Sequence, residues 1–199
     1  MIQQEKYVSI KKALKKELDK ERYQHTLSVA FTSCSLAMRY GADMDLAYIA
    51  GLLHDCAKNI PDDDRVKLCE KWGLPVNKTE KRNPTLLHAK MGAYLAKETY
   101  GIKDPEVLLA IENHTTGRPG MGLLEKIVFV ADYIEPYRTK AENLPAIRKE
   151  AFLDLDRAVL RISGDTYRYL LNKTPENIDP MTEEVFRYYQ KLAEEQPAR

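Results

Sequence analysis

The sequence predicts an all-α protein, a single-domain helical bundle. Apolar residues recur at helical spacing along almost the whole chain, and no segment alternates with the two-residue period of a strand. Glycine, proline and aspartate occur between these stretches, at positions typical of helix ends. The 199 residues can bury one core without disulfides. We therefore expect one domain, residues 1–199, with a core at about 20–135 on which helices within 144–194 pack.

The first half of the chain divides into four expected helices. Gly41 and Gly73 stand where a glycine in the left-handed conformation commonly ends a helix. Asp43 or Asp45 can accept hydrogen bonds from the free N–H groups at the start of the third helix. In order, the four helices contain residues 7–18, residues 27–38, the segment from Asp43 or Asp45 to His54-Asp55, and the segment between Pro61 and Gly73.

The second half contributes the remaining helices and two connections. Residues 123 to about 134 are nearly all apolar, so this segment is expected to be a central helix surrounded by protein. Asp104-Pro105 combines a capping residue with a proline at the first helical position. In order, helices are expected from Pro84 to about Tyr100, from Asp104 towards His114, from Leu123 to about Ile134, from Leu144 to Leu171 and beyond Pro180, with loops at 115–120 and 174–180.

Composition and charge argue against several classes of protein. The net charge is +1, without the basic excess of a protein that binds a nucleic-acid backbone. No stretch approaches the roughly 18 apolar residues of a membrane span, and no signal-peptide core is present. Cys34, Cys56 and Cys69 are odd in number and lack a CxxC spacing, which indicates reduced, packed thiols. We expect a cytoplasmic protein that binds neither nucleic acid nor membrane.

All four histidines of the chain fall into one series with aspartates. Imidazole and carboxylate together suit a divalent transition metal such as iron, manganese, cobalt or zinc, whereas a hard cation prefers oxygen ligands alone. Asp132 ends an apolar run, where an unpaired carboxylate would be costly to bury and a metal would remove that cost. The series, which predicts a metal site, runs His25, His54-Asp55, His88, His114 and Asp132.

Lys58 lies three residues beyond Asp55 and therefore on nearly the same helical face. Its ammonium could there meet a substrate phosphate. It could equally interact with the C-terminal end of the helix dipole, and spacing alone does not separate the two interpretations.

These residues resemble the signature of a known superfamily. The pattern His25, His54-Asp55, Asp132 and the stretch GLLHDCAK resemble the HD-domain metal-dependent phosphohydrolases. The length, the additional His88 and His114-Thr115, and the segment ADYIEPYR at 131–138 are similar to the YqeK family over nearly the whole chain. The resemblance implies symmetrical hydrolysis of bis(5′-nucleosyl) tetraphosphates, diadenosine tetraphosphate above all, to two molecules of ADP.

The resemblance also implies roles for individual residues. An iron would be held by His25, His54, Asp55 and Asp132. The nucleotide, ADP or a GDP-like product, would lie against the metal, and the connector at 177–180 would close over its base. The residues on the nucleotide side would be His25, Asp55, Lys58, His88, His114, Thr115, Asp132, Arg138, Asn177, Ile178, Asp179 and Pro180.

Phosphoryl transfer at such a site would use a divalent metal to acidify a water molecule and to neutralise phosphoryl oxygens. Asp55, Lys58, His88 and His114 are the expected catalytic residues, and the sequence does not choose which histidine protonates the leaving ADP. One ion is expected, iron before manganese or cobalt, because four protein ligands leave room for water and a phosphate oxygen. A second ion at His88 and His114 remains open, as does a homodimer.

Two other kinds of function remain open from the sequence. The first is a different HD-type phosphohydrolase, such as a nucleotidase or a cyclic-dinucleotide phosphodiesterase, although the GYP tripeptide typical of the latter does not occur. The second is a nucleotide-sensing module that binds ADP or an alarmone without turnover. A plain helical scaffold would require each buried histidine to find a partner independently. The complete ligand set, with a lysine and an arginine beside it, favours turnover.

Overall fold

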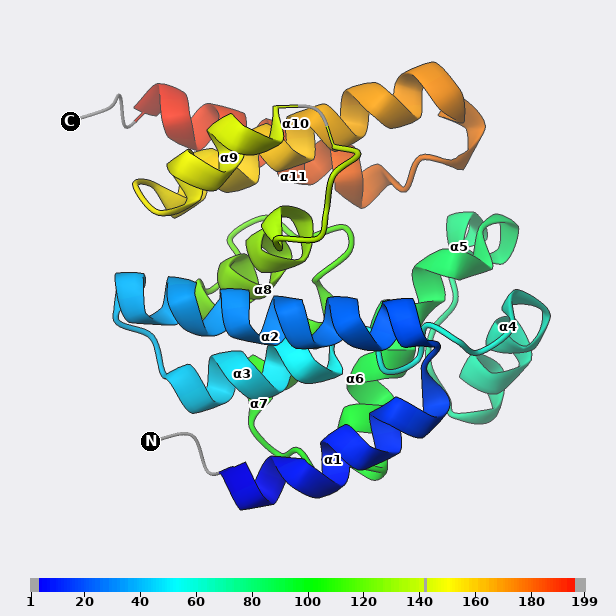
Figure 1. The fold of residues 1–199 in the computed structure, drawn as a ribbon. Helices are drawn as coiled ribbons and strands as arrows, with labels where there is room; N and C mark the ends of the chain where they lie inside the picture. Colours follow the sequence, from blue (N-terminus) through cyan, green and yellow to red (C-terminus); the bar gives the residue numbers. More distant parts are fainter. Residues whose placement is uncertain (1–3, 142, 196–199) are drawn as a thin grey trace.

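A computed structural model describes residues 4–141 and 143–195. Within these ranges the chain forms helices around a large apolar core and contains no strand, so the expected all-α class is confirmed (Figure 1). The α-helices are α1 (Gln4–Glu17), α2 (Lys20–Tyr40), α3 (Met44–Leu53), α4 (Asp62–Lys71), α5 (Lys78–Arg82), α6 (His88–Glu98), α7 (Pro105–Glu112), α8 (Leu123–Ile134), α9 (Leu144–Ala151), α10 (Leu155–Lys173) and α11 (Pro180–Glu195).

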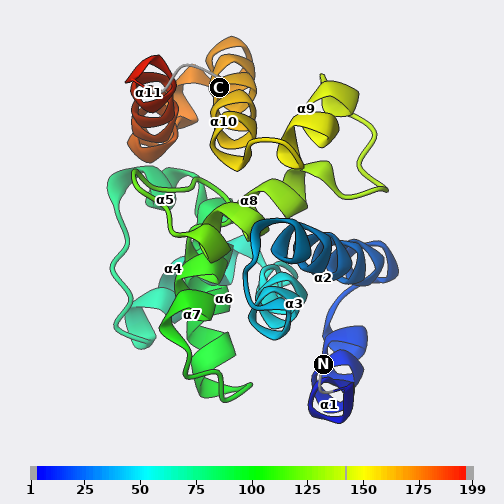
Figure 2. The same ribbon diagram turned by 90° about the vertical axis from the view of Figure 1, so that its left-hand side faces the viewer.

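The central helix is α8, as its apolar sequence predicts. It contacts α2, α3, α7, α9 and α10, and Ile127, Val128 and Val130 have no exposed surface. Figures 1 and 2 show α8 between a layer formed by α2 and α3 and a second layer formed by α9, α10 and α11. Residues of α8 therefore reach both layers.

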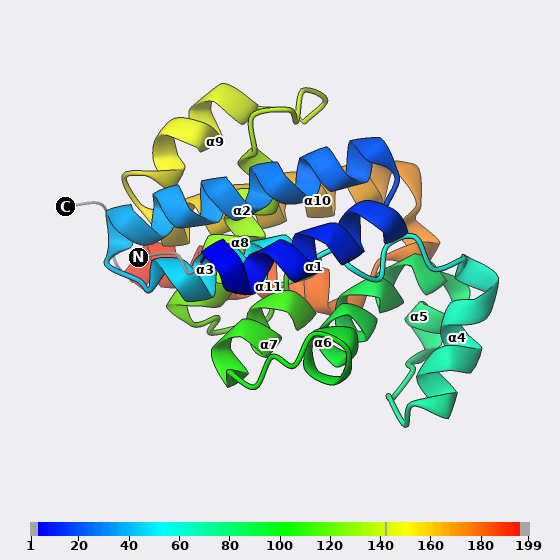
Figure 3. The ribbon, with the colours of Figure 1, turned by 60° about the horizontal axis from the view of Figure 1, so that its bottom comes forward.

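The helices α4 and α5 lie together at one side of the bundle (Figure 3). A second, smaller apolar cluster forms there, with Leu87 and Met91 at its centre and Trp72 packed against them. The buried Arg65 ties this side to the main bundle, because its guanidinium donates to the carbonyls of Lys58 and Ile60.

Several predicted helix ends are confirmed by their caps. Gly41 has φ 72° and its N–H donates to the carbonyl of Ala37 at the end of α2. The Asp43 carboxylate, and not that of Asp45, accepts from the first free N–H groups of α3. Asp104 caps α7 in the same way.

Other expectations were wrong in detail. The pattern from Leu144 to Leu171 is two helices, because the chain turns at Phe152 and Leu153 and Asp154 caps α10 by accepting from Arg157 N. The helix expected from Pro84 begins as a 3₁₀ turn, η1 (Pro84–Leu87), and a second 3₁₀ turn, η2 (Pro175–Asn177), lies in the connector before α11. The sequence analysis missed α5, which begins at a capping box of Asn77 and Glu80.

The three cysteines are buried and free, as expected. None of the described helices combines the length and the apolar character that crossing a lipid bilayer requires.

Candidate metal centre

The histidine series converges on Asp55. A glycine makes this possible, because a Cβ at Gly51 would lie 2.8 Å from Ala30 Cα, so only glycine lets α3 approach α2 this closely. Three of the residues lie in turns and not on helices as expected: His54 caps α3, Asp55 follows it, and His114 comes just after α7. The other three are His25 in α2, His88 at the start of α6 and Asp132 in α8.

An inner set of ligand atoms comprises His25 Nε2, His54 Nε2, Asp55 Oδ2 and Asp132 Oδ1. His25 Nε2 lies 3.3 Å from His54 Nε2 and 3.0 Å from Asp132 Oδ1. His54 Nε2 lies 3.4 Å from Asp55 Oδ2 and 3.9 Å from Asp132 Oδ1. An ion bound at about 2.1 Å has neighbouring ligand atoms roughly 3 Å apart. The inner set therefore has the spacing of a transition-metal site.

An outer set of side chains surrounds Oδ1, the second oxygen of the Asp55 carboxylate. Asp55 Oδ1 is 3.3 Å from His88 Nε2 and 3.6 Å from His114 Nε2, and these two nitrogens are 3.1 Å apart. Lys58 Nζ lies 3.2 Å from His88 Nε2, and Thr115 Oγ1 lies 3.1 Å from His114 Nε2. Lys58 and Thr115 therefore join the histidines in the outer set.

All four imidazole rings are oriented by an acceptor at Nδ1. The carbonyls of Gly51, Thr85 and Ile111 accept from His54, His88 and His114, and a Glu135 carboxylate oxygen lies 3.3 Å from His25 Nδ1. Because these acceptors require Nδ1 to carry the proton, the Nε2 lone pair of each neutral ring faces the centre. Such hydrogen bonds typically orient histidines that bind metals.

The electrostatics of the inner set favour a cation. The Asp55 carboxylate that the two sets share is buried, and its Oδ1, on the outer-set side, makes no hydrogen bond to any described group. Burial alone would raise the pKa of the Asp55 carboxyl, but its histidine neighbours, His54 first, hold this pKa well below its usual value. Burial also opposes ionisation of Asp132, and the close contact of its carboxylate with the His25 ring, at 3.0 Å, lowers its pKa. Two carboxylates facing imidazole lone pairs fit a divalent metal.

The outer set carries a different charge. Burial lowers the pKa of His88 to about 4, so its ring is neutral near pH 7. Burial also lowers the pKa of the Lys58 ammonium. A neutral acceptor beside an ammonium group can bind the oxygens and protons of a phosphate.

Two residues of the site were missed by the sequence analysis. Glu135 is buried beside His25, and Arg22 Nη1 donates to Asp55 Oδ2 at 2.7 Å. Arg22 lies one helical turn before His25, a spacing that places both on one face of α2 and could have identified it. No local pattern links Glu135 to His25, which is 110 residues away along the chain.

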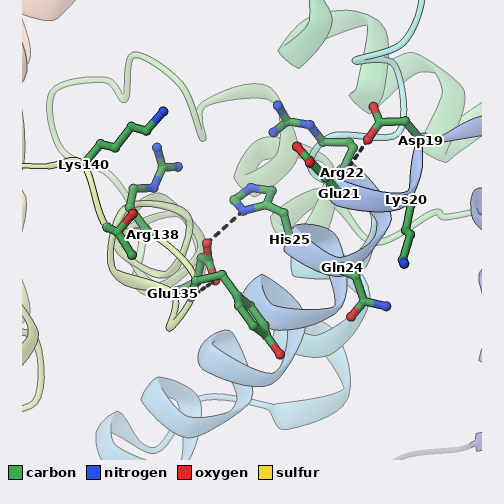
Figure 4. A pocket seen from close by; sticks show the side chains of 11 residues that line it. Asp19, Lys20, Glu21, Arg22, Gln24, His25, Glu135, Arg138 and Lys140 are labelled. Atoms are coloured by element: carbon green, nitrogen blue, oxygen red, sulfur yellow. Dashed lines mark hydrogen bonds and ion pairs between the residues drawn. The ribbon is translucent and has the colours of Figure 1, made fainter.

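The predicted nucleotide residues lie on two sides of the centre. Arg138 donates to Asp132 Oδ1 at 3.0 Å and lines a cleft of about 790 Å³ together with His25. Figure 4 shows His25 at this cleft between Arg22 and Arg138, with Lys140 beyond Arg138.

The other side faces α10 and α11. A hollow of about 50 Å³ is lined by His114, Thr115 and Asp132, and a neighbouring one of about 210 Å³ by Thr115 and Asp179. The structure thus brings part of the connector beside Thr115. Ile178 is half-buried and Pro180 begins α11, whereas the side chain of Asn177 lies outside the described residues.

Comparison with known proteins identifies the family. The model of the HD domain matches residues 22–137, a range that contains the whole inner set. The chain belongs to the HD-domain family. Membership implies a divalent metal and phosphohydrolase chemistry at the cluster of histidines and aspartates.

Relatives of this HD-domain protein resemble it along nearly their whole length. It is 38% identical over 179 residues to "Bis(5'-nucleosyl)-tetraphosphatase, symmetrical" from Bacillus subtilis, covering 90% of this chain and 93% of that protein. It is 39% identical to the protein of the same name from Halalkalibacterium halodurans, covering 92% and 95%. A crystal structure from Clostridium acetobutylicum, described as a "predicted HD superfamily hydrolase involved in NAD metabolism", has a TM-score of 0.89 at 40% identity, covering 94% of this chain and 97% of that one.

Proposed function

We propose that this HD-domain protein hydrolyses diadenosine tetraphosphate and related dinucleoside tetraphosphates symmetrically, giving two nucleoside diphosphates. One observation carries the proposal: the two oxygens of Asp55 face two different histidine pairs, one beside a second carboxylate and the other beside a lysine. A metal-binding half therefore adjoins a phosphate-binding half. The names of the relatives at 38% and 39% identity support the choice of substrate.

We assign the metal to His25, His54, Asp55 and Asp132. A divalent ion bound there supplies Lewis-acid charge that acidifies water and neutralises phosphoryl oxygens. The Glu135 carboxylate fixes the ring of His25, and the Arg138 guanidinium orients Asp132 from the cleft side. Iron suits this mixed nitrogen and oxygen set, and manganese or cobalt can replace it.

A single ion is the arrangement that the charges favour. The outer set could in principle hold a second ion, because Asp55, His88 and His114 offer ligand atoms close together. The Lys58 ammonium, however, lies 3.2 Å from His88 Nε2, where it would repel a second cation. The same ammonium attracts a phosphate, so we assign the outer set to the substrate.

The proton for the leaving ADP oxygen is assigned to Lys58. The histidines of the outer set carry their proton at Nδ1, where the carbonyls of Thr85 and Ile111 hold it, so their Nε2 atoms accept and do not donate. Lys58 is the protonated donor among them, and burial lowers its pKa, which makes the ammonium a stronger acid. Thr115 and the connector at 177–180 complete the proposed nucleotide side.

Product identification tests the proposal directly. Metal-loaded protein is incubated with diadenosine tetraphosphate in ¹⁸O-labelled water. The nucleotides are then separated, and their masses are measured by mass spectrometry. The expected result is ADP alone, with label in one of each pair of ADP molecules formed. ATP plus AMP would mean that attack is asymmetric, and tight binding without turnover would indicate a sensor.

A further inference from the structure

Symmetrical cleavage imposes a geometric requirement on the site. The bond that breaks lies at the middle of the tetraphosphate, so the two halves of the substrate must leave the metal centre in two directions. This requirement rests on the proposed function. The proposed function assigns one half to Thr115 and the connector at 177–180, on the side of α10 and α11, and the other half needs a second place to bind.

The cleft of about 790 Å³ lies at the centre on a different side from the α10–α11 hollows. Its lining comes from the start of α2 and from the segment after α8, and His25 belongs both to this lining and to the inner set. Arg148 of α9 fixes the far wall, because its guanidinium donates to the carbonyls of Ile134, Glu135 and Arg138. The cleft is therefore a formed feature next to the reacting atoms.

The basic groups of the cleft are placed to bind phosphate. Arg22 and Arg138 each donate to an oxygen of an inner-set carboxylate, at 2.7 and 3.0 Å, and flank His25 (Figure 4). Lys20 and Lys140 line the cleft, are exposed, and pair with no acid among the described residues. Arginine and lysine in this arrangement are typical of phosphate recognition.

The acids of the cleft are mostly engaged elsewhere. Asp19 accepts from Arg22 N as the cap of α2, and Glu135 accepts from Tyr137 N and contacts His25. Glu21 is the acid of the lining for which the described residues show no such contact. Arg22 and Arg138 therefore lie where the cleft meets the metal centre, and Lys20 and Lys140 add positive charge to its lining.

The same lining contains an exposed aromatic side chain. Tyr137 is 71% exposed, an unusual position for a large aromatic ring that lines a cleft. Every nucleobase has a flat face that stacks on such a ring. A cleft whose lining holds both cationic groups and an exposed aromatic ring offers partners for the phosphates and for the base of a nucleotide.

We propose that this cleft binds the second nucleoside diphosphate half of the substrate, with Arg22 and Lys140 at its phosphates and Tyr137 under its base. The two ADP products then occupy two distinct sites on one chain. Selection of a dinucleoside polyphosphate over a mononucleotide follows, because a mononucleotide fills only one of the two.

Binding of ADP to metal-loaded protein tests the second site without turnover. Isothermal titration calorimetry of the wild type should give two ADP per chain, and Tyr137→Ala and Lys140→Ala should each abolish or weaken the second binding event alone. In steady-state assays Tyr137→Ala should raise KM for diadenosine tetraphosphate by roughly 5- to 100-fold, the range of a lost stacking contact, and Lys140→Ala should raise it as well. Metal content and the affinity for the first ADP should not change.

Matched surface variants provide the controls. Tyr169→Ala removes a tyrosine that is 62% exposed on α10, and Lys12→Ala removes an exposed lysine of α1, and both should behave like the wild type. One ADP per chain in the wild type, or equal weakening of both ADP molecules in the variants, overturns the second site. If the wild type does not hydrolyse the substrate, the proposed function fails, while the ADP stoichiometry still decides whether the cleft binds a nucleotide.

Discussion

The inner and outer sets of the metal centre are built from nearly the same parts. Each has two imidazole Nε2 atoms and one oxygen of Asp55. The inner set adds the carboxylate of Asp132, whereas the outer set adds the ammonium of Lys58. The second carboxylate makes the inner set suited to a cation, whereas in the outer set the ammonium offsets the charge of the shared carboxylate and can attract a phosphate.

Removing the shared carboxylate should have the largest effect, because Asp55 serves both sets. Asp55→Ala should abolish metal retention and reduce hydrolysis of diadenosine tetraphosphate to the background rate. The helical circular dichroism should stay close to that of the wild type, because the turn that holds Asp55 lies outside the helices. Metal analysis of the purified variant, beside an activity assay, checks this. A variant that keeps both metal and activity would show that the ligand assignment is wrong.

Substitutions in the outer set should lower catalysis without removing the metal. Lys58→Met, His88→Ala and His114→Ala should each lower kcat by roughly 10²- to 10⁴-fold, the range typical of a lost acid or base. The purified proteins should keep one metal per chain. Elemental analysis decides between one ion and two ions per chain. Two ions in the wild type and one ion in the histidine variants would establish a dinuclear centre.

A substitution at Glu135, which contacts the non-ligating nitrogen of His25, should have a smaller effect on the metal centre. Glu135→Gln keeps the shape of the side chain but removes the charge beside His25 Nδ1. Metal affinity should fall by roughly 10- to 100-fold, as is typical when an outer hydrogen-bond partner of a ligand is lost. Competition with a chelator measures this affinity. Restoration of the wild-type rate by excess metal would confirm that Glu135 acts through metal binding, and a rate that stays low would refute it.

The smallest effect is expected at the cysteine that follows Asp55. Burial raises the pKa of the Cys56 thiol, which donates to the carbonyl of Gly92 at 3.5 Å and belongs to neither group of close ligand atoms. Cys56→Ser should therefore change activity by no more than a small factor and leave the metal in place. In the folded wild type, Cys56 should also resist alkylation at pH 8. Loss of metal in Cys56→Ser would instead indicate that the Cys56 sulfur is a metal ligand, and the assignment of the inner set would then be wrong.

Local signals predicted the helices well where a cap or a continuous apolar run marks them. The bounds of α8 were predicted correctly, because all-round burial requires an unbroken apolar sequence. The break between α9 and α10 was not predicted, because the apolar period continues across Phe152 and Leu153. For α5, the capping pair Asn77 and Glu80 was present in the sequence, but the helix is only five residues long and has too few apolar positions to show a period.

The sequence by itself determined the helical class, the C-terminal cap of α2, the cap of α7, the choice of two aspartates for the cap of α3, and the inventory of histidines and aspartates. These features depend on residue type and on neighbours within a few positions. Only the tertiary structure divided the histidines into two sets around Asp55, placed Glu135 behind His25 and brought Arg22 onto Asp55. The physical reason is that imidazole orientation, charge and distance in the centre are set by packing between residues up to 110 positions apart, and no local period records such contacts.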